Sequence, residues 1–342
     1  MRKRPRIFDT SWTEFTGGGQ NYDRFQPSYP SEVAKLISQH IRRAGLVGGI
    51  ADVGSGTGIF TRVLANELNG MVPIIGVEPN LDMMQVAMEA MPSDLQVSFQ
   101  NATAEQLPFQ DVSLSAIVSA TAAHRFDRKK FFGEVVRTVQ RGGIIALVRN
   151  RHRYWDSEAL TEFHSFIEGC VPEYRRGTVT TKDGGYSDVN FRSELLEDHR
   201  FSDVRAQTWE WDFETKLRHF IMTGLSTSIV QRCAEVTGPS KVVRFLQDLF
   251  RRHSIDGSLK ATVCNRDDLR NCVRWVTRQI ESINAPCHAA CSCVHTVTLP
   301  AEFHPILSLA LLSGSGAAGP CERRLLAALR HSAAPDPVGM WR

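Results

Sequence analysis

Three glycines alternate with other residues directly after a short apolar run in the segment IADVGSGTGIFTRVLA, residues 50–65. Gly54, Gly56 and Gly58 suit a chain that bends sharply and lets a ligand approach its backbone. Their spacing differs from the G-x-G-x-x-G fingerprint of nicotinamide-binding folds, and no lysine follows at the spacing of a triphosphate-binding loop. The turn, preceded by Asp52, therefore favours a ligand with a carboxylate and an amino group over a pyrophosphate. A plain glycine-rich turn is the alternative.

Glu78 is a second candidate, in the segment GVEPN at the end of the next apolar run. An acidic side chain in this position of a nucleotide-binding unit accepts hydrogen bonds from both ribose hydroxyls. The alternative is a solvated acid at the end of a strand. Because Glu78 follows the glycine turn at a compatible spacing, the sequence favours ribose binding.

The elements that must position these residues alternate between strand and helix. Apolar runs predict strands at residues 50–53, 72–78, 95–99, 114–119 and 143–149. Helical periodicity predicts helices at residues 31–44, 58–68, 81–91 and 128–140. This order indicates an α/β, doubly wound fold with a parallel sheet covered on both faces. Ligands bind beyond the carboxyl ends of such strands, where the glycine turn lies.

Composition limits the class of protein. The 342 residues are 42% hydrophobic and 23% charged, which is typical of a folded globular chain, and the net charge of +3 is too small to indicate nucleic-acid binding. The basic start MRKRPR has no apolar core after it, and the longest apolar stretch, residues 305–312, is too short for a membrane span. Six of the eight cysteines stand at Cys264 or later, so the main body is expected to be reduced. We therefore expect a cytoplasmic protein with neither a membrane nor a nucleic acid as partner.

The second half has weaker patterns. A helix is expected at residues 155–169, and FSDVRAQTWEWDF (201–213) is expected to form one strand, with residues 256–264 as its hairpin partner. Trp209 and Trp211 would then face the same side of that strand. A further helix is expected at residues 266–284 and a poorly packed tail at 285–342. The tail segment CHAACSCVH lacks the spacing of a zinc ribbon, so no metal site is expected.

Five motifs occur in the order found in one family. ADVGSGTG, GVEPN, NATAEQLPFQDVSLSAIVSATAAHRFD and RTVQRGGIIALV follow the opening segment YDRFQPSYP. Together they resemble the class I S-adenosylmethionine-dependent methyltransferases, in particular the small-molecule branch labelled methyltransferase type 11. The likeness covers roughly residues 20–150 and continues more weakly to about 265. It implies a mostly parallel, seven-stranded Rossmann-like sheet with a helical lid insertion at about 150–200. The expected divisions are an arm at 1–30, a methyltransferase domain at 31–265, and a helix and tail at 266–342.

The resemblance also implies a role for individual residues. The methionine portion of S-adenosylmethionine would be held by Asp52, Gly54, Ser55, Gly56 and Gly58. Glu78 would hold the ribose, and the adenine would be flanked by Pro79, Asn80, Met83, Thr103 and Ala104. Thr103 replaces the aspartate usual in the family and would accept the adenine hydrogen bond more weakly. Ser119 and Ala120 would line the floor, while Tyr22 and Arg24 would close over the cofactor, unless they form an exposed arm.

The chemistry of transfer is less determined by the sequence. His124 stands where the branch often has a substrate-facing histidine, and it is the candidate general base, with Tyr22 as a second candidate catalytic residue. Alternatively, His124 only packs under the lid. Arg125 replaces the usual tryptophan. Arginines interspersed with aromatic residues favour an anionic acceptor with an apolar part, or else a solvated basic face: Arg149, Arg151, Arg153, Arg175 and Arg176, with Tyr154, Trp155 and Tyr174. Glu168 and Glu173, nearby, are expected to be exposed helix acids; the alternative is that they remove a proton or stabilise a carbocation.

The sequence thus predicts methyl transfer from S-adenosylmethionine to a small-molecule acceptor, at oxygen or carbon. A member of the same fold that binds the cofactor without methylating, as a cyclase or a binding protein, is the alternative. A nucleic-acid methyltransferase is disfavoured, since neither an N-P-P-Y-like motif nor a Pro-Cys nucleophile is present.

Overall fold

The computed structural model describes residues 15–150, 157–207, 209, 211–263 and 274–277. The chain divides into two units, Met1–Ser282 and Ile283–Arg342. All described residues belong to the first unit. The tail and the segment CHAACSCVH lie outside the described residues.

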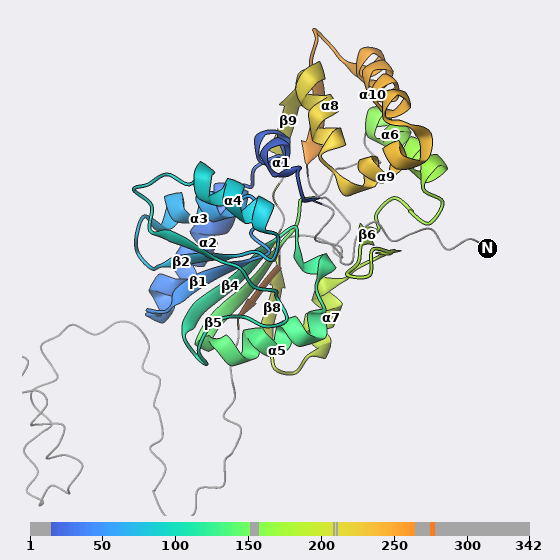
Figure 1. Ribbon diagram of the computed structural model, residues 1–342. Helices are drawn as coiled ribbons and strands as arrows, with labels where there is room; N and C mark the ends of the chain where they lie inside the picture. The colour runs from blue at the N-terminus through green and yellow to red at the C-terminus, as the bar shows by residue number, and fades with distance from the viewer. Residues whose placement is uncertain (1–14, 151–156, 208, 210, 264–273, 278–342) are drawn as a thin grey trace, which may run out of the picture. The chain divides into compact units, whose positions relative to one another are not determined.

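A sheet with five parallel strands forms the centre of this unit (Figure 1). Its strands lie side by side in the order β3-β2-β1-β4-β5. Their bounds are β1 (Gly49–Val53), β2 (Ile74–Val77), β3 (Val97–Gln100), β4 (Leu114–Ala120) and β5 (Val139–Val148). All neighbouring pairs run parallel. The predicted α/β fold with a mostly parallel sheet is confirmed, and β1 lies at its centre.

Side chains alternate between the two faces of the sheet, as the pleat requires. On one face, Ile50 of β1 and Val118 of β4 pack into a cluster with α2 (Ser31–Ala44) and α3 (Ile59–Leu68). On the other face, Ala51 and Ile117 join a second cluster that contains α5 and α7. Strands β1 and β4 are therefore buried on both sides, which explains why their sequences are mostly apolar, whereas the edge strand β3 is only partly buried.

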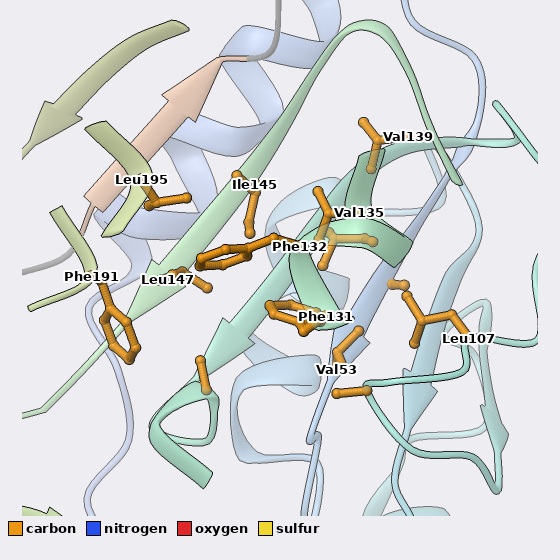
Figure 2. Packing of buried hydrophobic residues seen from close by; sticks show 14 of the residues in the cluster. Val53, Leu107, Phe131, Phe132, Val135, Val139, Ile145, Leu147, Phe191 and Leu195 are labelled. Atoms are coloured by element: carbon orange, nitrogen blue, oxygen red, sulfur yellow. The ribbon is translucent and has the colours of Figure 1, made fainter. Parts of the chain in front are cut away.

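The second cluster is centred on α5 (Arg128–Thr138). Figure 2 shows the ring of Phe132 next to Ile145 and Leu147 of β5, and the ring of Phe131 next to Val53 of β1. Phe131 is fully buried. Aromatic side chains of this size contribute most of the burial that holds the helix on the sheet. Further along the chain, α7 (Phe191–Glu197) adds Phe191 and Leu195 to the same cluster.

Two antiparallel strands extend the sheet beyond β5. Strand β11 (Arg274–Thr277) pairs with both β5 and β8 (Ser202–Ala206). The prediction of a helix over 266–284 is wrong at 274–277, and the rest of that range lies outside the described residues. An apolar period in a short segment does not distinguish helix from strand, and here strand pairing over a long sequence distance decides.

The predicted single strand at 201–213 is also wrong. The segment forms β8 and, separately, β9 (Trp211–Thr215), which belongs to a two-stranded sheet with β10 (Leu259–Val263). The predicted pairing with residues 256–264 is confirmed for β9 and β10. Trp209 lies between the strands and packs, half-buried, on the cluster of α2 and α3, so the two tryptophans do not share one strand.

Helices α6 and α8 to α10 form a separate cluster around a core that includes Ile167, Cys233 and Leu246. Their bounds are α6 (Glu158–Cys170), α8 (Leu217–Leu225), α9 (Ser228–Thr237) and α10 (Pro239–His253). A short hairpin of β6 (Val179–Thr180) and β7 (Tyr186–Ser187) follows α6. None of the helices in the described residues has the length and apolar character to cross a bilayer.

Shortening the chain tests the part that β11 plays in the sheet. A chain that ends after residue 273 loses β11 and leaves the edge of β5 unpaired, so we expect it to melt several degrees lower or to precipitate. A chain that ends after residue 284 keeps β11 and is expected to retain the melting temperature of the full chain. Thermal melts followed by circular dichroism measure both. Equal melting of the two shortened chains would contradict this account of the sheet.

Candidate functional site

A cavity of about 130 Å³ opens at the carboxyl ends of the parallel strands. Its walls come from the glycine turn after β1, the segment after β2, the residues after β3 and β4, and the N-terminal arm. The lining residues are Phe15, Tyr22, Tyr29, Asp52, Gly54, Ser55, Gly56, Thr57, Ile59, Phe60, Glu78, Pro79, Met83, Thr103, Ala104, Glu105, Ala120, Thr121, Ala122, Arg125 and Phe126. The cavity therefore lies where doubly wound sheets bind their ligands.

The glycine turn has two different reasons for its glycines. Gly54, with φ of 71°, has no room for a side chain, since a Cβ there would lie 2.5 Å from the Cβ of Ala122. Gly56, with φ of 56°, faces open space, and its nearest neighbour would be Cε of Met83 at 3.6 Å. Gly58 allows α3 to pack closely on α4 (Leu81–Ala90), because a Cβ at this position would lie only 3.2 Å from the Cβ of Ala87. Gly58 does not line the cavity.

Asp52 is fully buried at the end of β1. Its Oδ2 accepts a hydrogen bond of 2.6 Å from the hydroxyl of Thr61, while Oδ1 has no hydrogen-bond partner among the described residues. Burial raises the pKa of this carboxyl from 3.8 to about 7. The hydroxyls of Ser55 and Thr57 are likewise buried without a partner in the described part of the chain. These three polar groups fit a bound polar ligand, because buried polar groups are normally hydrogen-bonded.

Glu78 is held just beyond β2 by two backbone N–H groups. Gly56 donates to Oε2 and Asn80 donates to Oε1, each at 2.9 Å. The side chain is only 6% exposed, and burial raises the pKa of its carboxyl to about 6, against the lowering effect of these hydrogen bonds. The carboxylate is therefore fixed beside the glycine turn, where it could accept hydrogen bonds from a ligand.

The N-terminal arm closes one side of the cavity with α1 (Gly19–Phe25). The carboxylate of Asp82 on α4 accepts hydrogen bonds from Gly17 N at 3.0 Å and Gly19 N at 3.3 Å. Arg62 on α3 pairs with Asp23 at 2.6 Å. These contacts place the ring of Tyr22 against the cavity. Burial raises the pKa of its phenol.

The structure brings most of the predicted cofactor residues to the cavity wall. Those that line it are Tyr22, Asp52, Gly54, Ser55, Gly56, Glu78, Pro79, Met83, Thr103, Ala104 and Ala120. Others do not: Gly58, Asn80, Ser119 and Arg24. Asn80 instead caps α4 by accepting from Asp82 N and Met83 N. Arg24 is exposed, with its guanidinium 5.5 Å from the ring of Phe25.

His124 is buried in the short 3-10 helix η2 (Ala123–Arg125) and does not line the cavity. Burial, reinforced by the charges of Arg125, Arg149 and Arg128, holds the pKa of its imidazole well below the usual 6.5. His124 is therefore neutral near neutral pH.

Most of the predicted arginines lie away from the cavity wall. Arg176 pairs with Glu168 at 2.7 Å, and Arg175 donates to the carbonyls of Pro172 and Tyr174. Arg149 is buried without lining the cavity, and Glu173 is exposed. Tyr174 is buried and shares a hydrogen bond of 2.9 Å with His164. The predicted residues Arg151, Arg153, Tyr154 and Trp155 lie outside the described residues.

Among the described residues, Arg125 is the arginine that lines the cavity. Its guanidinium lies 4.9 Å from the ring centroid of Phe15 and donates a hydrogen bond of 3.0 Å to the hydroxyl of Ser228 on α9. A positive charge and an aromatic ring thus meet at one end of the cavity.

Several lining residues have no counterpart in the sequence prediction. Phe15, Tyr29, Thr121 and Phe126 come from segments far apart in the chain. Tyr29 and Phe126 stand inside motifs that were used for the family resemblance, so position within a motif could have pointed to them. No pattern around Phe15 sets it apart from other aromatic residues in the sequence.

Comparisons with known proteins agree with this geometry. A family model described as a methyltransferase domain matches residues 51–147. An uncharacterized methyltransferase of Mycobacterium tuberculosis is 33% identical over 223 residues, which cover 65% of this chain and 77% of the relative. The chloroplastic tocopherol O-methyltransferase of Arabidopsis thaliana is 26% identical over 221 residues, 58% of this chain and 61% of that protein.

A solved structure has the same fold. A candidate type II methyltransferase from Anaeromyxobacter dehalogenans has a TM-score of 0.55 at 18% identity and covers 75% of this chain and all of its own. The chain belongs to the methyltransferase family, and the resemblance indicated by its five motifs is confirmed.

Alanine substitutions separate the two glycines of the turn. Gly54→Ala is expected to lower the free energy of unfolding by about 2–4 kcal/mol, because the new methyl collides with Ala122 in a left-handed backbone. Gly56→Ala is expected to cost about 1 kcal/mol from backbone strain alone. Urea denaturation measures both changes. Equal losses of stability would contradict the difference in space around the two residues.

The raised pKa of Asp52 predicts how the stability of the ligand-free protein depends on pH. The folded pKa, about 7, exceeds the unfolded value of 3.8, so this stabilising contribution is complete below about pH 4 and is lost as pH rises through 7. Asp52→Asn removes the titration. The melting temperature of the variant relative to the wild type should therefore rise by a few degrees from pH 5 to pH 8. A difference that does not vary with pH would refute the shift.

Proposed function

We propose that the protein transfers the methyl group of S-adenosylmethionine to a small-molecule acceptor, at oxygen or carbon, and that this acceptor carries an anionic group and an apolar part. The observation that carries the proposal is the pair of buried carboxyls, Asp52 and Glu78, at the ends of neighbouring strands and facing one cavity. In this proposal the sheet is the seven-stranded one of class I methyltransferases, and the insertion at about 150–200, which contains α6, forms its lid.

The residues at the cavity support a site for the whole cofactor. Asp52 and the hydroxyls of Ser55 and Thr57 offer polar groups to the methionine portion, and the open backbone at Gly56 leaves room beside them. Glu78 would accept hydrogen bonds from the ribose. Pro79, Met83, Thr103 and Ala104 would flank the adenine.

When bound, S-adenosylmethionine supplies an electrophilic methyl group on a positively charged sulfur. The residues of the chain bind and orient the reactants and exclude water from them. Asp52 and Glu78 favour the binding of a cation, because a nearby positive charge offsets the free-energy cost of ionising a buried carboxyl group. Rings of Phe60, Phe126 and Tyr29 give the cavity apolar walls.

Arg125 and Phe15 support an anionic acceptor with an apolar part. A guanidinium binds a carboxylate or a phosphate through paired N–H groups, and the adjacent ring offers apolar contact. The name of the Arabidopsis relative supports transfer to oxygen, since that protein is an O-methyltransferase of tocopherol. Tyr22 would orient the acceptor or the cofactor from the arm. His124 was the sequence-based candidate for accepting a proton, but it is buried away from the cavity wall and its low pKa makes it a weak base, so the structure offers no support for that role.

Substitution of Glu78 tests the cofactor site. Loss of the charge in Glu78→Gln is expected to weaken the binding of S-adenosylmethionine by about 10- to 100-fold, because charge-assisted hydrogen bonds to the ribose are lost. Glu89→Gln, on the exposed face of α4, is the matched control and should leave the affinity unchanged. Isothermal titration calorimetry measures both. An unchanged affinity in Glu78→Gln removes this residue from the site.

Methyl transfer itself is tested with S-adenosylmethionine labelled in its methyl group. The purified protein and the labelled cofactor are incubated with small-molecule extract, and labelled products are separated by chromatography. A labelled anionic product supports the proposal. Cofactor binding without any labelled product would favour the non-methylating alternative, and absence of cofactor binding would exclude both.

A further inference from the structure

Two hydroxyl groups meet at the carboxyl end of β4. The phenol oxygen of Tyr29 lies 3.0 Å from the hydroxyl oxygen of Thr121, which is 92 residues away in the sequence. Both side chains line the cavity. The ring of Tyr29 packs edge-on against Phe60, at 5.1 Å between centroids, so its direction is fixed. The pair is therefore a defined feature of the cavity wall.

Thr121 adopts a backbone conformation that its side chain disfavours. Its φ is 52°, in the left-handed region, which is costly for a β-branched residue. Its N–H donates to Val148 O at 2.8 Å, and its hydroxyl oxygen accepts from Asn150 N at 3.3 Å. Strain of this kind persists where the surroundings hold a residue in place, and it concentrates at functional sites.

The hydroxyl pair retains one hydrogen-bond donor that the described residues do not use. The two hydroxyls carry two protons, and the bond between them uses one. The N–H of Asn150 is a donor, so it occupies a lone pair of Thr121 and no proton. No other hydrogen bond reaches either hydroxyl from the described residues. Whichever hydroxyl donates to the other, one O–H is left for the cavity.

We propose that the hydroxyl pair of Tyr29 and Thr121 donates this hydrogen bond to an oxygen of the methyl acceptor at the carboxyl end of β4. The pair thereby selects acceptors with a hydroxyl or carbonyl oxygen at that position over acceptors without one. This inference rests on the proposed function, because it takes the cavity to be the place of methyl transfer.

The pair acts as a neutral donor, not as a base. Burial raises the pKa of the Tyr29 phenol, and the nearby Tyr22 and Asp52 add to the increase, against the hydrogen bond to Thr121. The phenol therefore keeps its proton near neutral pH. A fixed neutral donor binds an oxygen lone pair and leaves an apolar group in the same place with an unsatisfied hydrogen bond, which is the basis of the selection.

Two probes of nearly equal shape test the donor. Acetophenone has a carbonyl that only accepts hydrogen bonds, whereas ethylbenzene lacks the oxygen. Their dissociation constants are measured by ligand-observed NMR on the full chain, with and without S-adenosylhomocysteine. The ratio of the two constants should change by about 2- to 10-fold, against acetophenone, in the double variant Tyr29→Phe/Thr121→Val. Thr121→Ser keeps the hydroxyl and should keep the wild-type ratio.

The outcomes separate this inference from the proposed function. If S-adenosylhomocysteine binds the wild type and all variants alike but the probe ratio is the same in the double variant, the donor is refuted and the proposed function stands. If S-adenosylhomocysteine does not bind the wild type, the proposed function fails, and the probe ratio without it still tests the donor. Should the double variant not fold, Tyr29→Phe/Thr121→Gly replaces it, because glycine accepts the φ of Thr121 without strain.

Discussion

The carboxyl ends of β1 and β4 approach so closely that the residue after β1 must lack a side chain. Gly54 meets this constraint, and its left-handed backbone turns the chain toward β2. The turn then presents the N–H of Gly56 to the carboxylate of Glu78. Three strand ends are thus tied together by one tight contact and one hydrogen bond. The remaining walls of the cavity come from the arm and from the segments that follow β2, β3 and β4, next to this junction.

The junction keeps two acidic side chains out of water. Asp52 and Glu78 repel each other when both are ionised, and the charge of Glu78 contributes to the raised pKa of Asp52. Without a ligand, this arrangement is electrostatically unfavourable near neutral pH. A bound cation would relieve it, so the residues that destabilise the ligand-free protein would stabilise a complex with a cationic ligand. Such a trade between stability and binding is common at functional sites.

Local patterns identified the residues of the junction, but neither its contacts nor other contacts between distant parts of the chain were predicted. The glycine spacing and the apolar runs identified all five parallel strands and the residues at their ends, because a turn of this kind is encoded within a few residues. The pairing of β11 with β5 depends on residues more than 120 positions apart. A short segment with an apolar period, such as the one that contains β11, can form either a helix or a strand, and pairing with a partner strand decides between them.

The positions of the charged side chains also depend on contacts that the local sequence does not reveal. The predicted arginines lie between positions 149 and 176, yet Arg176 pairs with Glu168 on α6. Within the described part of the chain, the cavity wall contains Arg125 instead. Sequence proximity therefore misled where a side chain could turn toward another partner. Phe15 and Tyr29 were not predicted as lining residues, because contacts between the arm and α3, α4 and α8, which are distant in the sequence, bring the arm to the cavity.

The long-range contacts of the arm also determine when the cavity can be completed during folding. The hydroxyl of Thr223 donates to the carbonyl of Phe25, and the amide of Gln26 donates to the hydroxyl of Ser226, across 198 and 200 positions of the chain. Helix α1 and Gln26 can therefore make these bonds only after about 200 further residues have been synthesised. Contacts of such long range are slow to form. The five parallel strands are complete at Val148 and can pair while translation continues. The arm can make these bonds only after α8 and Ser226 have been synthesised, so a nascent chain that stalls before α8 would carry an open site.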